Sequence, residues 1–182
     1  MKKCKLLLSA LLVMGLTVST FGAAHKAGEK LTTFQQVFLK SYTGETDKLV
    51  DLAEAFSEKG YSWRPAEGIR SVREAILHIA SANYGIASKL GKEVPEGVNP
   101  RSFEKSITGK AETIKVLKDS IRFAKAAVRG LNEESLKEQI DLYGNESPRM
   151  AAVMVLGGHA YEHLGQLIAY ARSSDVVPPW SK

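Results

Sequence analysis

The stretch of sequence that decides the fold class is residues 147–173, which read SPRMAAVMVLGGHAYEHLGQLIAYARS. Ser147 is the expected N-cap of a helix. Pro148 is the expected first helical residue, where the missing N–H of proline has no consequence. Residues 176–180 (VVPPW) contain two prolines and cannot continue the helix. The stretch therefore predicts one long helix that runs to about Ser173.

Three further segments have apolar residues at three- and four-residue spacing, which is typical of a helix with one buried face. They predict helices over residues 33–59, 72–90 and 110–129. Glycine favours helix ends. The residues expected to end these three helices are Gly60, Gly91 and Gly130.

Two of these helices have a recognisable start. Thr33 with Gln36, and Ser71 with Glu74, match the capping box, in which a hydroxyl and a longer polar side chain satisfy free backbone N–H groups. Residues 131–146 are predicted to be a polar connection, with at most one short turn of helix at 133–138. No segment alternates as a strand does, and four amphipathic helices predict an all-α fold, an antiparallel four-helix bundle.

The N-terminus has the pattern of a secretory signal peptide. Three lysines precede the apolar run 6–18, and small residues follow, with Gly22 and Ala24 at the −3 and −1 positions of the expected cut. The run has 13 residues, whereas a membrane-spanning helix needs about 20. The sequence predicts cleavage after Ala24, an exported bacterial protein of residues 25–182, and no stable membrane span; retention as an N-terminal anchor is the alternative.

Cleavage changes the charge balance. The full chain of 182 residues has 25 basic and 20 acidic side chains, and residues 1–24 contain three of the lysines and no acid. The mature chain therefore has a net charge of +2, without the clustered basic face that nucleic-acid binding requires. The only cysteine of the full chain, Cys4, leaves with the signal peptide, which excludes a thiol nucleophile, a disulfide and a cysteine zinc site in the mature chain.

Three histidines carry the chemical signal. His159 and His163 lie one helical turn apart on the same helix face, where they could chelate one metal ion. His78 lies beside the apolar stripe of the second helix, among small residues. Three imidazoles with an open fourth position are typical of catalytic zinc, although imidazole also suits nickel, copper and iron. The alternative is that the three histidines are ordinary residues at the edge of the core.

A second motif overlaps this pair. Residues 159–163 (HAYEH) match the H-x-x-E-H signature of inverted zinc peptidases, in which the glutamate is the general base. Only 19 residues follow His163, and the one acid among them, Asp175, lies beyond the helix. We interpret the match as chance and expect Glu162 to orient a neighbour or to face solvent.

Residues 61–65 (YSWRP) with 71–84 (SVREAILHIASANY), and residues 159–172 (HAYEHLGQLIAYAR) with 177–180 (VPPW), together resemble the DinB-like family of four-helix metalloproteins. The resemblance extends over essentially the whole mature chain. It implies a divalent metal ion, often nickel or zinc, held by His78, His159 and His163. Gln166 would then orient a ligand as an outer hydrogen-bond partner.

The resemblance also implies a range of functions. Family members are often homodimers, some are thiol transferases, and a related branch isomerises maleylpyruvate with a thiol cofactor. Those thiols are cytosolic, whereas this chain is expected to be exported, so its reaction stays open. We expect a metal-dependent hydrolase or transferase with a small-molecule substrate; the alternative is a non-catalytic bundle that binds a metal or a ligand. Glu74 and Glu162 are the carboxylates expected nearest the histidines.

Overall fold

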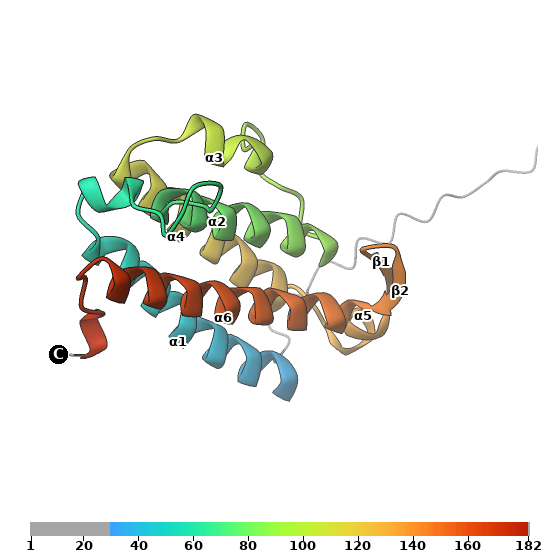
Figure 1. The fold of residues 1–182 in the computed structure, drawn as a ribbon. Coiled ribbons are helices and arrows are strands. Elements are labelled where there is room, and N and C mark those ends of the chain that lie inside the picture. Colours follow the sequence, from blue (N-terminus) through green and yellow to red (C-terminus); the bar gives the residue numbers. More distant parts are fainter. Residues whose placement is uncertain (1–29, 182) are drawn as a thin grey trace, which may run out of the picture.

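The structure is a computed structural model that describes residues 30–181 (Figure 1). The predicted signal peptide, residues 1–24, lies outside the described residues. Four long helices form a bundle: α1 (Thr33–Ala55), α2 (Val72–Lys89), α4 (Lys110–Arg129) and α6 (Arg149–Ser173). The shorter elements are η1 (Lys59–Ser62), η2 (Pro100–Ser102), α3 (Phe103–Ser106), α5 (Glu133–Lys137), β1 (Gln139–Leu142), β2 (Asn145–Pro148) and η3 (Pro179–Ser181).

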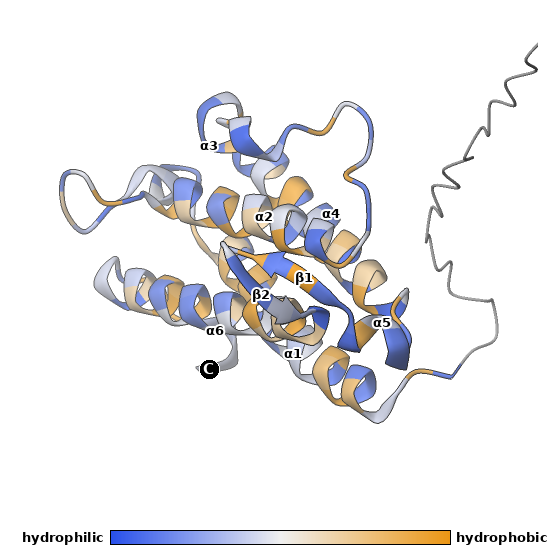
Figure 2. Ribbon diagram, turned by 90° about the vertical axis from the view of Figure 1, so that its right-hand side faces the viewer, coloured by the Kyte–Doolittle hydropathy of each residue, from blue (hydrophilic) through white to orange (hydrophobic). Residues whose placement is uncertain are grey.

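The long helices form a closed ring in the order α1, α4, α2, α6, and each packs against its two neighbours. Their apolar faces meet in one core, and Figure 2 shows hydrophobic and hydrophilic bands alternating along each long helix. The prediction of four long helices around one core is therefore confirmed. The third helix, 110–129, has the predicted bounds. None of the described helices is long and apolar enough to span a membrane.

The directions of the helices differ from the prediction of an antiparallel bundle. Ser41 lies beside Tyr161, and Phe38 lies beside Gly157, so α1 and α6 run in the same direction. Helices α2 and α4 also run in the same direction (Figure 1). The pairs α1/α4 and α2/α6 are antiparallel, as Tyr170 near Arg70 shows for the second pair. The prediction is therefore wrong for two of the four neighbouring pairs.

A long crossover, residues 90–109, makes the parallel pairing of α2 and α4 possible, because the chain must return to the end where α2 began. It contains η2 and α3 and lies over α2. Arg73 of α2 binds the crossover: its guanidinium donates to the carbonyl oxygens of Glu104 at 3.1 Å and Ile107 at 2.5 Å. These bonds hold α3 next to the middle of α2.

The connection between α4 and α6 contains two strands that the sequence analysis did not predict. β1 and β2 pair as an antiparallel hairpin, and at its turn Tyr143 and Gly144 both have positive φ, 56° and 83°. Two consecutive residues with positive φ are typical of the tightest hairpin turns. The strands have four residues each and only Leu142 is buried, which is too little alternation to detect in the sequence.

This hairpin also moves the start of the last helix. Ser147 pairs with Ile140 in the hairpin, and Pro148 is the N-cap of α6, with no side-chain capping bond. The predicted Ser147 cap is therefore wrong by one residue.

The other caps agree in part with the sequence prediction. The Ser71–Glu74 capping box of α2 is confirmed, whereas the box of α1 is formed by Thr32 and Gln35, one residue earlier than predicted. Gln35 is buried, and its amide is satisfied because it also donates to the carbonyl oxygens of Val128 and Leu131, at and just beyond the end of α4. The first helix ends at Ala55 rather than residue 59, and the second at Lys89 rather than residue 90.

Candidate metal centre

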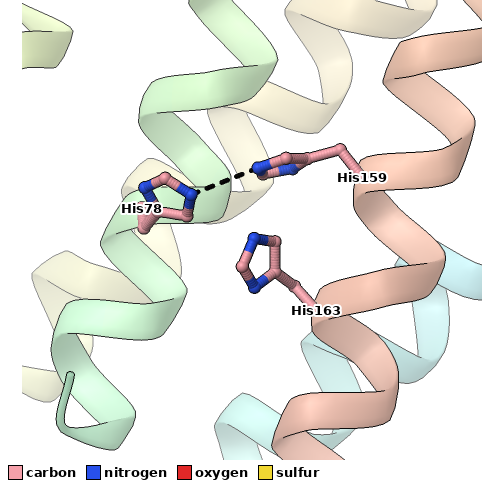
Figure 3. Close-up of side chains that lie close together, drawn as sticks. All are labelled: His78, His159 and His163. Atoms are coloured by element: carbon pink, nitrogen blue, oxygen red, sulfur yellow. Dashed lines mark hydrogen bonds between the residues drawn. The ribbon is translucent and has the colours of Figure 1, made fainter. Parts of the chain in front are cut away.

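The antiparallel packing of α2 and α6 brings three imidazoles together (Figure 3). His78 comes from α2, and His159 and His163 come from successive turns of α6. His78 Nε2 lies 3.2 Å from His159 Nε2, and one ring nitrogen from each of the three residues lies within 4.8 Å of the others. All three side chains are half-buried, at the border between the core and the surface.

The donor set fits a divalent transition metal. Two nitrogens that share a tetrahedral zinc ion at 2.0–2.1 Å lie about 3.3 Å apart, and the 3.2 Å between His78 and His159 is close to this separation. Among the described residues, the group contains three ligands and no fourth histidine, cysteine, aspartate or glutamate. The arrangement can therefore hold a metal ion and leave a position open.

A chain of hydrogen bonds fixes the ring of His163. Its Nδ1 lies 2.7 Å from Gln166 Oε1, and Gln166 Nε2 donates to the Tyr170 hydroxyl at 2.9 Å. That hydroxyl donates to the carbonyl oxygen of Arg70 at 3.1 Å. Because an amide oxygen only accepts, His163 Nδ1 carries the proton and Nε2 keeps its lone pair for a metal. Gln166 is thus the hydrogen-bond partner of His163, and its role as an outer partner of a metal ligand stays a prediction.

A carboxylate that the sequence analysis missed lies beside His78. Glu104 Oε1 lies 3.6 Å from His78 Nδ1, on the side away from the other two imidazoles. Arg70 Nε donates to both Glu104 oxygens, at 3.1 and 3.3 Å. Glu104 belongs to the short helix α3, and no periodicity or motif in the sequence places α3 against α2. The position of Glu104 beside His78 depends on the hydrogen bonds from Arg73 to the crossover.

The two carboxylates that the sequence indicated lie elsewhere. Glu74 accepts from the backbone N–H of Ser71 at 2.7 Å and pairs with Arg64 at 3.0 Å. The bond from Ser71 is the main reason why the pKa of Glu74 is below its usual value. Glu162 is exposed. The structure shows no hydrogen bond or ion pair between either carboxylate and the three histidines, among the described residues.

The surroundings favour neutral imidazoles, the form that binds metal. Burial lowers the pKa of His159 to about 4, with smaller contributions from His163, His78 and Arg70. Burial is also the main reason why the pKa of His78 is lowered, and the charge of Arg70 adds to it. Glu104 and Glu162 oppose this shift of the His78 pKa. The imidazoles of His78 and His159 are therefore neutral at neutral pH, and each has one ring nitrogen with a lone pair available to a metal ion.

The fold and the site together define a helical-bundle protein whose histidine group can hold a metal ion. The chain belongs to the DinB family: the family model matches residues 29–182. The resemblance seen in the sequence is thereby confirmed.

The comparisons include one curated relative and several solved structures. Uncharacterized protein YjoA of Bacillus subtilis (strain 168) is 29% identical over 126 residues, which are 67% of this chain and 79% of YjoA. A DinB-like protein from Bacillus cereus ATCC 10987 has a TM-score of 0.69 at 20% identity, over 79% of this chain and 95% of that one.

The crystal structure of YjoA has a TM-score of 0.61 at 21% identity, over 78% of this chain and 94% of that one. A conserved protein from Enterococcus faecalis has a TM-score of 0.62 at 17% identity, over 79% of this chain and 97% of that one. At these identities the structural matches show the shared fold.

Proposed function

We propose that the protein is an exported, metal-dependent hydrolase or transferase that acts on a small molecule. His78, His159 and His163 would hold one divalent metal ion, nickel or zinc. The observation that carries the proposal is the convergence of three imidazoles from α2 and α6 on one point, with no fourth ligand in the group among residues 30–181. Three nitrogen ligands with an open position are typical of catalytic zinc, whereas structural zinc has four protein ligands.

The chemistry that a metal supplies at such a site is Lewis acidity, which activates a bound water or polarises a substrate atom. The residues of this chain supply the orientation. Gln166 and Tyr170 hold the ring of His163, and Glu104 lies behind His78. Outer partners of this kind fix the tautomer and the direction of metal-binding histidines.

Export is supported by the N-terminal sequence, with its three lysines, its apolar run 6–18 and the small residues up to Ala24. Expression of the full chain in a bacterium with an efficient export pathway tests it. N-terminal sequencing of the periplasmic protein is expected to begin at His25. Full-length protein confined to the cytoplasm would contradict this part of the proposal.

One observation favours the non-catalytic alternative. Glu74 is engaged by Ser71 and Arg64, and Glu162 faces solvent, so neither carboxylate is placed to transfer a proton at the histidines. Glu104 lies 3.6 Å from His78, and Arg70 already donates to both of its oxygens. A bundle that only binds a metal or a ligand would have such a site.

Metal content and turnover decide between these functions. Residues 25–182, purified without a metal-binding tag, are expected to contain about one nickel or zinc per chain by elemental mass spectrometry. His159→Ala should lose most of it. His25→Ala is the matched control, because His25 is the remaining histidine of the chain.

The metal-loaded protein is then tested on a panel of esters, amides and electrophiles with added thiols. Turnover that disappears in His159→Ala supports the proposal that the protein is a metal-dependent enzyme. Stoichiometric metal with no turnover on the whole panel favours the binding protein. No metal after reconstitution, or full metal in His159→Ala, would contradict both the metal-dependent enzyme and a metal-binding role of the three histidines, and would leave the bundle that binds another ligand.

A further inference from the structure

A second candidate binding site lies between α1 and α6. It is a groove of about 340 Å³ that we call the α1–α6 groove. The side chains that line it from α6, Met154 and Tyr161 among them, follow a different stripe of the helix from the histidines. Tyr161 lies two residues from His159 and thus about 160° around the helix axis. The groove is therefore separate from the metal centre.

Aromatic rings dominate its walls. Phe34, Phe38 and Tyr42 stack along α1, with ring centroids 6.4 Å apart for the first pair and 5.4 Å apart for the second. Tyr161 faces them from α6, and its hydroxyl is hydrogen-bonded to Ser41 at 2.6 Å. The face of an aromatic ring is electronegative and attracts organic cations.

Of the described residues that line the groove, Glu45 is the one with a charged side chain. The side chain of Glu45 is only 16% exposed. Among the described residues its ion pair is with Lys48, whose Nζ lies 3.8 Å from Oε2, longer than a hydrogen bond. The same Nζ lies 5.9 Å from the ring of Trp180. A carboxylate on a largely shielded side chain, whose one paired cation among the described residues is 3.8 Å away, gains from a second cation that enters the groove.

We propose that the α1–α6 groove binds a small organic ammonium compound. Its cationic head pairs with Glu45, and its apolar body lies against the rings of Phe34, Phe38 and Tyr161. Three features of the groove favour an organic ammonium compound. They are the aromatic walls, the shielded Glu45 side chain and the volume, which is within the range of small-molecule sites. Binding does not require the metal, because no metal ligand lines the groove.

A second copy of the chain is the rival occupant. Val37, Met154 and Tyr161 lie at the groove and are 65%, 58% and 50% exposed, which is unusual for large apolar side chains. An apolar face of a second copy would remove the Glu45 carboxylate from water and leave it only the 3.8 Å contact with Lys48, which costs free energy. The carboxylate therefore favours the cation over the second copy.

Benzyltrimethylammonium is the probe, and isothermal titration calorimetry with residues 25–182 measures its binding. We expect saturable binding with one site per chain. Phenylacetate, with the same ring and the opposite charge, should not bind, and benzyl alcohol should bind more weakly than the ammonium. Glu45→Gln, which keeps the shape and removes the charge, should weaken binding about fivefold to tenfold.

Two glycine variants locate the site. Gly158 lines the groove, and a Cβ added there meets no atom within 4 Å, so Gly158→Leu should fold and fill the groove. Gly165→Leu is the matched control, because Gly165 lies on the same helix, is equally open and does not line the groove. Binding should be lost in Gly158→Leu, retained in Gly165→Leu and retained in the metal-deficient His163→Ala variant.

Several results would overturn the proposal. These are no binding of the probe to a folded monomer, equal binding of phenylacetate, or unchanged affinity in both Glu45→Gln and Gly158→Leu. Sedimentation at the titration concentration tests the rival occupant. A dimer that excludes the probe, and that dissociates in Gly158→Leu but not in Gly165→Leu, would assign the groove to the second copy instead.

Discussion

The carboxylate of Glu104 lies 3.6 Å from Nδ1 of His78, on the side opposite to the other imidazoles. If His78 holds a metal, Glu104→Gln should lower the metal affinity, because the amide stabilises the metal-bound imidazole less than the carboxylate does. Outer partners of metal-binding histidines typically contribute about tenfold to a hundredfold in affinity. Titration against a competing chelator measures the change, and we expect a loss near the lower end of this range, since Glu104 is one-third exposed.

The matched control for this substitution is Glu96→Gln, in the same crossover but exposed and without a hydrogen bond or ion pair to the histidines among the described residues. It should leave the affinity unchanged. Equal affinity in Glu104→Gln and the wild type would show that the carboxylate is a partner of Arg70 and has no role at the metal centre.

At the scale of single residues, part of the candidate site could be predicted from the sequence, because three of its residues lie on one helix. His159, His163 and Gln166 share one helix face, and their relative placement follows from 3.6 residues per turn. His78 could be placed on the right helix, although the meeting of the two helices came from the family resemblance. Glu104 could not be predicted, because its position depends on contacts between α2 and a crossover that has no periodicity.

At the scale of elements, the contact between α1 and α6 depends on one glycine. A Cβ at Gly157 would lie 2.9 Å from Cε2 of Phe38, so Gly157→Ala forces that buried ring to move. Overpacking of this kind typically costs about 1–3 kcal/mol. We expect a loss of stability in this range from urea unfolding of the metal-free protein.

The neighbouring glycine gives the opposite prediction. A Cβ at Gly158 meets nothing within 4 Å, and Gly158 lies inside α6. Gly158→Ala should therefore stabilise the protein by up to about 1 kcal/mol, through the higher helix propensity of alanine. A similar loss of stability in both variants would mean that the close contact with Phe38 is not the cause.

The capping box of α2 predicts a pH dependence. The pKa of Glu74 is lowered, first by its bond from the Ser71 backbone. A group with a lowered pKa in the folded state stabilises the fold above its unfolded pKa, and this contribution disappears as the pH falls through the folded value. Glu74→Gln should therefore cost about 0.5–1 kcal/mol at pH 7, a magnitude typical of caps.

The cost should shrink as the pH falls below about 4, where the wild-type carboxyl is protonated as well. Urea unfolding of both proteins from pH 7 to pH 3, without metal, measures the difference. Histidine protonation is common to both proteins and cancels. A constant or growing difference in the free energy of unfolding would contradict the role of the Glu74 charge.

The elements themselves could be predicted to different degrees. The four long helices follow from apolar spacing and capping residues. The hairpin β1–β2 could not be predicted, because four-residue strands with one buried side chain have no measurable alternation. The parallel pairs α1/α6 and α2/α4 were also missed, since apolar stripes indicate which face is buried but not which neighbour lies against it.

At the scale of the whole molecule, the candidate metal ligands join distant parts of the chain. His78 lies in α2 and His159 in α6, 81 residues later, and the two helices are neighbours in the ring. The unfolded chain has no preformed site, so a metal that binds these residues stabilises the folded bundle by mass action. The pairing of α2 with α6 is then linked to the metal concentration.

Thermal unfolding of the wild type with and without metal tests this linkage. At a free metal concentration of 100 times Kd the stabilisation is about 2.7 kcal/mol, which corresponds to an increase in Tm of roughly 5–10 °C for a domain of this size. At equal free concentrations, nickel and zinc should give different increases in Tm, ranked by their affinities. His163→Ala should show little of this increase, whereas His25→Ala should retain it in full. An equal increase in His163→Ala and the wild type would show that the metal stabilises the protein elsewhere, and the three histidines would then be residues of the core border.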